Sequence, residues 1–107
     1  MSDCVLLYAT APDGTIAATI AAALLETRAA ACVNIIPGMR SLYRWQGRVE
    51  SADEVVMVVK TTKVACDKAR AVILERHPHG TPAILALTVD AELSSAPFLA
   101  WLAAETT

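Results

Sequence analysis

The chain has 107 residues, of which 55% are hydrophobic and only 5% aromatic, so alanine and aliphatic side chains must fill its core. This length and composition predict one globular domain over residues 1–107 and exclude a disordered chain. The formal net charge of −2 argues against a nucleic-acid partner, because phosphate binding requires clustered Lys and Arg.

Cellular location follows from hydropathy and cysteine usage. The longest uncharged stretches fall short of the ~20 apolar residues that a membrane-spanning helix needs, so we expect no membrane association. The start, Met1-Ser2-Asp3-Cys4, lacks the basic region of a secretion signal. Three cysteines without a framework spacing indicate reduced thiols, and hence a cytoplasmic protein.

The first predicted elements are a strand and a helix. Cys4–Thr10 is continuously apolar, which is typical of a strand buried on both faces. Asp13 lies in the turn that follows and is a candidate N-cap for a helix over Thr15–Ala29. An apolar stripe at helical spacing predicts its buried side, consisting of Ile16, Ala17, Ile20, Ala21, Leu24 and Leu25.

A long two-stranded ribbon should come next. Its first strand is expected to start near Ala31 and to kink or bulge at Pro37-Gly38, because proline cannot donate to a ladder. Beyond the kink the strand continues as Met39–Trp45, and Gln46-Gly47 predicts a hairpin turn.

The return strand of this ribbon is predicted in two parts. Arg48–Glu50 pairs back along the hairpin, Ser51–Asp53 is expected to loosen the strand, and Glu54–Thr61 resumes it. The arginines on the ribbon, Arg40, Arg44 and Arg48, are interpreted as a solvated strand face because acidic residues follow directly.

The remaining elements are a helix, a strand and a short helix. Thr61 or Thr62 can cap a helix over Lys63–His77, which Pro78 ends. Thr81–Val89 is predicted as a strand. A last helix from Ser95 or Ala96 to Glu105 has Pro97 in its first turn and places Phe98, Trp101 and Leu102 on one stripe.

The resulting order, β-α-β-β-α-β with a terminal helix, predicts an α+β fold of the ferredoxin-like type, with both main helices on one face of an antiparallel sheet. The ribbon carries Leu42, Tyr43, Trp45 and Val49, more apolar surface than so small a domain can cover. A second copy of the chain is the expected cover.

Several segments, taken in order, resemble the CutA divalent-cation-tolerance family over nearly the whole chain. They are Thr10–Asp13, Ala30–Gly38, Ser41–Gly47, Lys60-Thr61, His77-Pro78 and Trp101-Leu102. The resemblance implies a ferredoxin-like subunit in a homotrimer, ribbons that reach across to neighbouring subunits, and a link to copper and divalent-metal tolerance without established catalysis.

The chain also departs from that family. His79 stands where members usually have tyrosine, and Ala83 replaces an acidic residue after the proline. Ala9 and Arg76 occupy positions at which some members have the cysteine and the second histidine proposed to bind copper. Of those proposed ligands only His77 is retained.

Cys32, His77 and His79 are the candidate metal ligands. Thiolate suits Cu(I) or Zn, and imidazole suits Zn, Cu and Ni. The alternatives are that Cys32 is a small buried hydrophobe and that His77 is a cation at a helix C-terminus. A complete site would need ligands from elsewhere, for which another subunit is the best source.

Tyr43, Trp45 and Lys60 resemble residues of the family's inter-subunit cleft. Trp45 also fits an interface anchor, and Lys60 fits a side chain whose ammonium group reaches solvent along an apolar stem. For Trp45 we favour the interface anchor, whereas for Lys60 both interpretations stay open.

No sequence motif nominates a catalytic site: there is no phosphate-binding glycine loop, no nucleophile elbow and no Cys-x-x-Cys. We therefore expect a non-enzymatic homotrimer that acts in divalent-metal tolerance by weak binding of copper or another divalent metal in an inter-subunit cleft. The alternatives are a trimeric signalling module similar to the PII group, binding an anion or nucleotide, and a trimeric scaffold.

Overall fold

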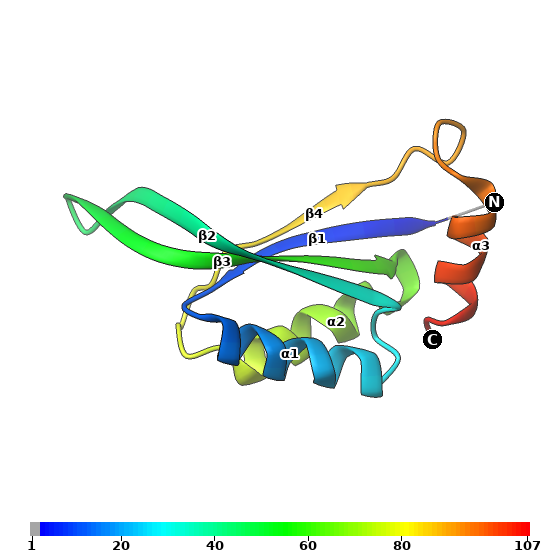
Figure 1. Ribbon diagram of the computed structural model, residues 1–107, viewed down its shortest axis with the longest axis horizontal. Coiled ribbons are helices and arrows are strands. Elements are labelled where there is room, and N and C mark those ends of the chain that lie inside the picture. The colour runs from blue at the N-terminus through cyan, green and yellow to red at the C-terminus, as the bar shows by residue number, and fades with distance from the viewer. Residues whose placement is uncertain (1–2) are drawn as a thin grey trace.

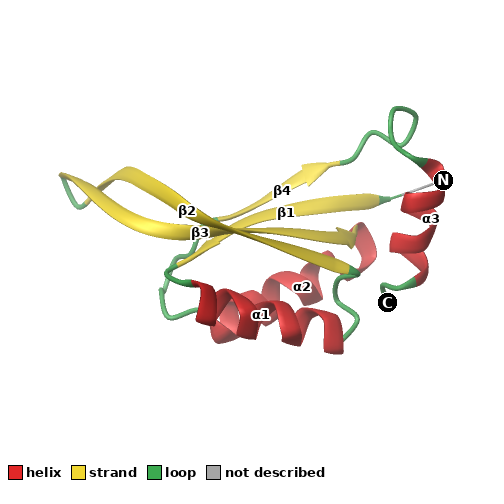
Figure 2. Cartoon of the chain, viewed as in Figure 1, coloured by secondary structure: helices red, strands yellow, loops and turns green. Residues whose placement is uncertain are grey.

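The computed structural model describes residues 3–107 and shows a four-stranded antiparallel sheet with three helices (Figure 1). The strand order in the sheet is β2-β3-β1-β4. The elements are β1 (Cys4–Ala11), α1 (Gly14–Glu26), β2 (Cys32–Trp45), β3 (Arg48–Thr62), α2 (Lys63–Arg76), β4 (Ile84–Thr88) and α3 (Ala96–Ala104). Helices α1 and α2 both cover the same face of the sheet (Figure 2), which confirms the predicted ferredoxin-like α+β fold.

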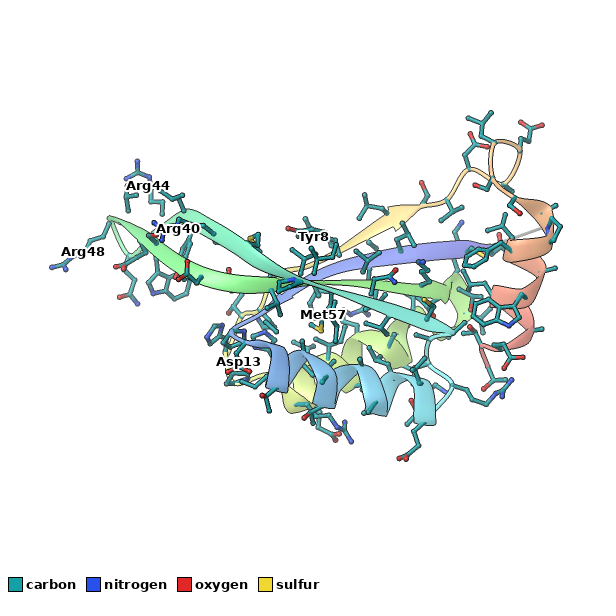
Figure 3. All side chains as sticks on the ribbon, in the orientation of Figure 1. Tyr8, Asp13, Arg40, Arg44, Arg48 and Met57 are labelled. Carbon is teal, nitrogen blue, oxygen red and sulfur yellow. The ribbon has the colours of Figure 1, made fainter. Side chains whose placement is uncertain are left out.

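The core lies between that face and the two helices. Alternate residues of β1 and β3 point toward the helices, and Figure 3 shows Met57 on this side and Tyr8 on the other. Small residues on α1 let the helix approach the sheet closely, since Ala17 is fully buried. The largest fully buried side chains include Leu7, Ile20, Leu24, Met57 and Ile73.

The predicted burial is wrong at Leu25, which is 45% exposed. It follows the buried Leu24 directly, and one residue of helix is a rotation of about 100°, enough to turn Leu25 away from the sheet. The predicted burial of β1 on both faces is also wrong within one chain, because Tyr8 is 37% exposed.

Both predicted N-caps are formed. The Asp13 carboxylate accepts a hydrogen bond from the backbone N–H of Ile16 at 2.8 Å, and the Thr62 hydroxyl accepts one from Ala65 N–H at 3.3 Å. These bonds satisfy backbone donors that a helix N-terminus otherwise leaves without partners.

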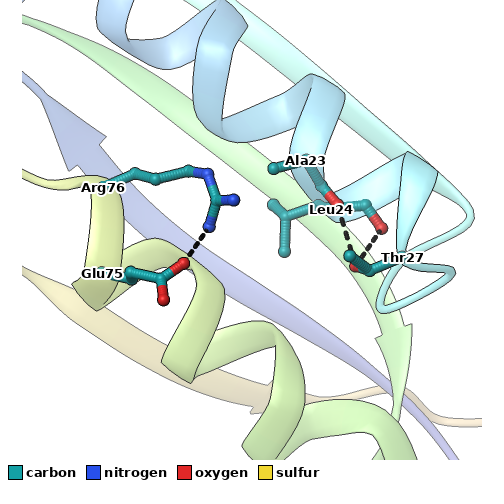
Figure 4. Close-up of polar contacts among 5 residues, drawn as sticks. All are labelled: Ala23, Leu24, Thr27, Glu75 and Arg76. Carbon is teal, nitrogen blue, oxygen red and sulfur yellow. Dashed lines mark hydrogen bonds and ion pairs between the residues drawn. The ribbon is translucent and has the colours of Figure 1, made fainter.

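Helix α1 ends at Glu26, three residues before the predicted end. Arg28 adopts a left-handed backbone with φ 59°, which terminates the helix. The Thr27 hydroxyl donates to the Ala23 carbonyl at 2.8 Å and to the Leu24 carbonyl at 3.4 Å, as Figure 4 shows. Helix α2 ends at Arg76, one residue before the predicted His77.

Strands β2 and β3 continue past the helices as a two-stranded arm, defined here as residues 39–54 (Figure 1). The expected bulge lies between Ile36 and Met39, where Gly38 has φ 82°. The hairpin turn needs positive φ at both central residues, and Gln46 (49°) and Gly47 (79°) supply it.

The prediction that Ser51–Asp53 loosens the return strand is wrong. These residues pair with Leu42, Ser41 and Arg40 in an unbroken ladder, and Arg40 Nε lies 3.4 Å from an Asp53 carboxylate oxygen. Pairing with the facing strand therefore overrides the weak local strand propensity of the segment.

Strand β4 is shorter than the predicted Thr81–Val89 and covers only Ile84–Thr88. Pro82 has no N–H to donate, so regular pairing cannot begin before it. Beyond each end of β4, one further hydrogen bond joins the chain to β1. Thr10 N–H donates to the Ala83 carbonyl at 3.3 Å, and Val89 N–H donates to the Cys4 carbonyl at 3.4 Å.

Helix α3 packs across the end of the sheet near the N-terminus (Figure 1). Its buried residues are Leu99 and Leu102, which cluster with Cys4, whereas Phe98 and Trp101 are 43% and 44% exposed. The two aromatic residues lie side by side, as the predicted stripe requires, with ring centroids 5.5 Å apart, but both stay partly exposed in one chain. Within residues 3–107, no helix is long and apolar enough to cross a membrane.

Candidate functional site

The sheet face opposite α1 and α2, called the open face below, is predominantly apolar and uncovered over much of its area. The strand register places Cys32, Lys60, Leu6 and Leu87 in one cross-strand row, and Asn34, Val58, Tyr8 and Leu85 in the next. Leu85 is 62% exposed and Leu87 48%. Sequence reasoning missed this surface, although two continuously apolar strands, Cys4–Ala11 and Ile84–Thr88, could have indicated it, because both main helices were expected on the opposite face.

The arm exposes a second apolar surface. Leu42, Tyr43, Trp45 and Val49 are all between 44% and 69% exposed. The arm extends beyond the helices, so nothing in one chain covers it (Figure 1). The predicted cleft residues Tyr43 and Trp45 lie on this arm.

Lys60, the third predicted cleft residue, lies far from the other two in one chain. Tyr43 pairs with Glu50, which is ten residues from Lys60 along β3, a path of about 33 Å at ~3.3 Å per residue. If these three side chains share a cleft, they must come from different copies of the chain.

Lys60 lies at the end of the open face that α3 approaches. Its Nζ is 5.4 Å from the centroid of the Phe98 ring, a cation–π contact, and Cys32 is its cross-strand partner on β2. No Lys60 ion pair forms within residues 3–107. The contact with Phe98 joins residues 38 positions apart, so no local sequence pattern could have revealed it.

The two histidines lie at the opposite end of the sheet. His77 is 8% exposed, and its Nε2 is 2.8 Å from the Thr10 carbonyl oxygen. The backbone N–H of His79 donates to His77 Nδ1 at 3.1 Å, and the two ring centroids are 4.9 Å apart. The exposed His79 ring makes no hydrogen bond within residues 3–107.

The structure does not bring Cys32 together with the histidines in one chain. Cys32 aligns with Leu6 across the sheet, whereas His77 bonds to Thr10, four residues or about 13 Å further along β1. No group of three His, Cys, Asp or Glu side chains in the described chain is placed to hold a metal ion. The described residues of one chain therefore form no complete metal centre.

The positions that differ from the copper-ligand pattern also supply no ligand. Ala9 is fully buried among the core residues. The Arg76 guanidinium lies 2.5 Å from a carboxylate oxygen of Glu75 (Figure 4). Ala83 contributes a backbone carbonyl to Thr10 and no side-chain ligand.

The four-stranded sheet with α1 and α2 on one face defines a ferredoxin-like domain, which adds a long arm and leaves the other sheet face uncovered in one chain. The family model described as "CutA1 divalent ion tolerance protein" matches residues 5–105. The chain belongs to this family, and the resemblance drawn from its sequence is confirmed.

Relatives support this membership over nearly the full length. The chain is 45% identical over 102 residues to "Divalent-cation tolerance protein CutA" of Thermus thermophilus, covering 95% of each chain. It is 39% identical to the protein of the same name in Pectobacterium atrosepticum, covering 95% of this chain and 91% of the relative.

Solved structures agree. The divalent cation tolerance protein of Thermus thermophilus matches with a TM-score of 0.93 at 40% identity, covering 97% of this chain and 99% of that one. CutA of Xylella fastidiosa matches with a TM-score of 0.94 at 34% identity, covering 99% and 100%. A Nostoc structure described as a "PII-like protein CutA" in apo form matches with a TM-score of 0.89 at 28% identity, covering 96% and 97%.

Proposed function

We propose that this protein acts in divalent-cation tolerance as a homotrimer that binds a divalent metal weakly between its subunits and catalyses no reaction. Membership in the CutA1 divalent ion tolerance family supports the general role. The main support for an assembly is the open face of the sheet, where Tyr8, Leu85 and Leu87 expose a contiguous apolar surface. Soluble single chains rarely leave such a surface bare.

The arm provides the natural cover for this face. It is a two-stranded extension whose exposed side chains include Tyr43 and Trp45, and aromatic residues are favoured anchors of interfaces. An arm from one subunit that lies on the open face of the next would bury both surfaces at once. Three copies follow from the family resemblance in the sequence.

A metal shared between subunits would draw on Cys32 and His79. The Cys32 thiol is free and half-buried, and the His79 ring is exposed and bound to no hydrogen-bond partner in the described chain. They lie at opposite ends of the sheet, so both can contact one ion only if they come from different subunits. The proposed location is the cytoplasm, because three cysteines without a framework spacing are typical of reduced thiols.

Zinc titration of the assembled protein tests the metal proposal. Zn²⁺ suits both thiolate and imidazole and does not oxidise the thiol, so it is the cleanest probe. We expect Cys32→Ser and His79→Gln each to weaken zinc binding about tenfold or more, since even loss of a group behind a metal ligand typically weakens binding that much. Isothermal titration against a competing chelator measures the affinity.

Cys66→Ser is the matched control, because Cys66 is also free and half-buried but lies on α2. Its zinc affinity should equal that of the unmodified protein. Equal affinities in all the variants would reject Cys32 and His79 as ligands, and a Cys66→Ser loss as large as that of Cys32→Ser would reject the proposed location.

Lys60 favours a second candidate function, a PII-like module that binds an anion or nucleotide between subunits. Its ammonium group lies on the open face with an aromatic ring as its charge contact and no carboxylate partner in the described chain. Covering this charge with another subunit would favour an anion beside it. A nucleotide at ~100 times its Kd would stabilise the protein by about 2.7 kcal/mol, so thermal shifts separate this function from metal binding and from a scaffold without ligand.

A further inference from the structure

The partners of His77 fix the position of its ring proton. A carbonyl oxygen can only accept, so Nε2, at 2.8 Å from the Thr10 carbonyl, must carry a hydrogen. A backbone N–H can only donate, so Nδ1, at 3.1 Å from His79 N, must be bare. Both conditions are met by one state of the ring, the neutral Nε2–H tautomer.

The Thr10 carbonyl at the end of β1 has no backbone donor within residues 3–107, so a side chain must provide its hydrogen bond. Thr10 N–H donates to the Ala83 carbonyl on the β4 side of β1, and the N–H and C=O of one residue in an antiparallel ladder point to the same side. Strand β4 begins only at Ile84, so no strand donor reaches the Thr10 carbonyl. The imidazole of His77 supplies that donor and takes the place of a missing rung of the ladder.

The other nitrogen organises the turn that follows α2. Pro78 restricts His77 to an extended backbone, seen as φ −85° and ψ 135°. This brings the backbone N–H of His79 onto His77 Nδ1 and sets the His79 ring 4.9 Å from the His77 ring. His77 thus fixes where His79 is presented to solvent.

These bonds conflict with a role for His77 as a metal ligand. Coordination requires a bare ring nitrogen. At Nε2 the metal would displace a proton and leave the Thr10 carbonyl, on a residue only 8% exposed, without a donor. At Nδ1 it would displace the His79 N–H and release the turn that holds the second imidazole.

We propose that His77 is a positioning residue that clamps the α2–β4 turn to β1, and that a divalent metal at this end of the sheet contacts His79 and not His77. The metal half of this inference rests on the proposed function, whereas the clamp does not.

Long-range proton–nitrogen NMR of the ¹⁵N-labelled protein tests both halves. Without metal, the His77 ring should show a protonated Nε2 and a bare Nδ1. Addition of Zn²⁺ should shift the His79 ring nitrogens and leave those of His77 in place. A protonated Nδ1, or His77 nitrogens that shift as far as those of His79, would overturn the inference. If no ring responds to Zn²⁺, the proposed metal function fails, and the His77 tautomer still decides the clamp.

Two matched variants distinguish a role of His77 in holding the turn from a role as a metal ligand. His77→Gln keeps an amide N–H that can reach the Thr10 carbonyl, whereas His77→Leu keeps an apolar body and removes both hydrogen bonds. The His79 backbone N–H lies on an exposed residue and can bond to water instead, whereas the buried Thr10 carbonyl cannot. We therefore expect His77→Leu to lower Tm by about 4–8 °C, the effect of losing the one bond to Thr10 in a domain of this size, and His77→Gln to recover part of that loss.

Zinc affinity should show the opposite pattern. His77→Gln should stay within about twofold of the unmodified protein, while His79→Gln should lose about tenfold or more and keep its Tm. A zinc loss in His77→Gln equal to that in His79→Gln would show that His77 is a ligand.

Discussion

Replacing Leu85 with glutamate is expected to separate the assembled protein into single subunits. Leu85 is 62% exposed in one chain, so the substitution leaves the folded core of the subunit untouched. In the assembly it would place a carboxylate on the open face beside Tyr8, under a neighbouring subunit. An unpaired buried charge costs about 3 kcal/mol or more, which weakens association at least ~100-fold. Sedimentation velocity over a concentration series measures this.

Leu74→Glu provides the control for this prediction. Leu74 is 47% exposed on α2, on the helical side of the molecule. The substitution Leu74→Glu therefore introduces the same charge, but away from the open face. It should sediment as the unmodified protein does. An unchanged assembly in Leu85→Glu, or equal dissociation of both variants, would contradict the proposed use of the open face.

Met57→Ala is expected to lower the free energy of unfolding by about 2–5 kcal/mol, the usual range for truncating a buried side chain of this size. Met57 is fully buried and points from β3 toward α1 and α2 (Figure 3), so its loss leaves a cavity at the centre of the core. Chemical denaturation at one fixed protein concentration is the measurement, because the apparent stability of an oligomer depends on concentration.

The matched change is Val64→Ala, at a position 89% exposed in the first turn of α2. It should alter the free energy of unfolding by no more than about 0.5 kcal/mol. Equal losses in Met57→Ala and Val64→Ala would mean that the core is not centred where the structure places it.

Features set by a few neighbouring residues were predictable from the sequence. Asp13 and Thr62 cap their helices because an acceptor side chain precedes a helical stripe, and Pro37-Gly38 causes a bulge because proline lacks a donor. The end of α1 was missed because Arg28 adopts positive φ without being glycine. The continuity of β3 through Ser51–Asp53 was missed because it depends on the facing strand.

The candidate site was predictable only in part, because its geometry joins residues far apart in the chain. The sequence identified His77 and His79 as the only histidine cluster, but not the bond from His77 to Thr10, 67 positions away, that occupies its Nε2. The exposed apolar surface of the arm was predictable, because the sequence of the ribbon contains more large apolar residues than a small domain can cover. The open face was not predictable, because only the strand register brings Tyr8 and Leu85 next to each other.

The most direct test of the account is the mass of the unmodified protein in dilute solution near neutral pH. The uncovered sheet face and arm predict a stable assembly, and the family resemblance predicts three copies, so we expect three times the 11.3 kDa of one chain in sedimentation equilibrium at micromolar concentration and below. A soluble, folded protein of 11.3 kDa under these conditions would contradict it.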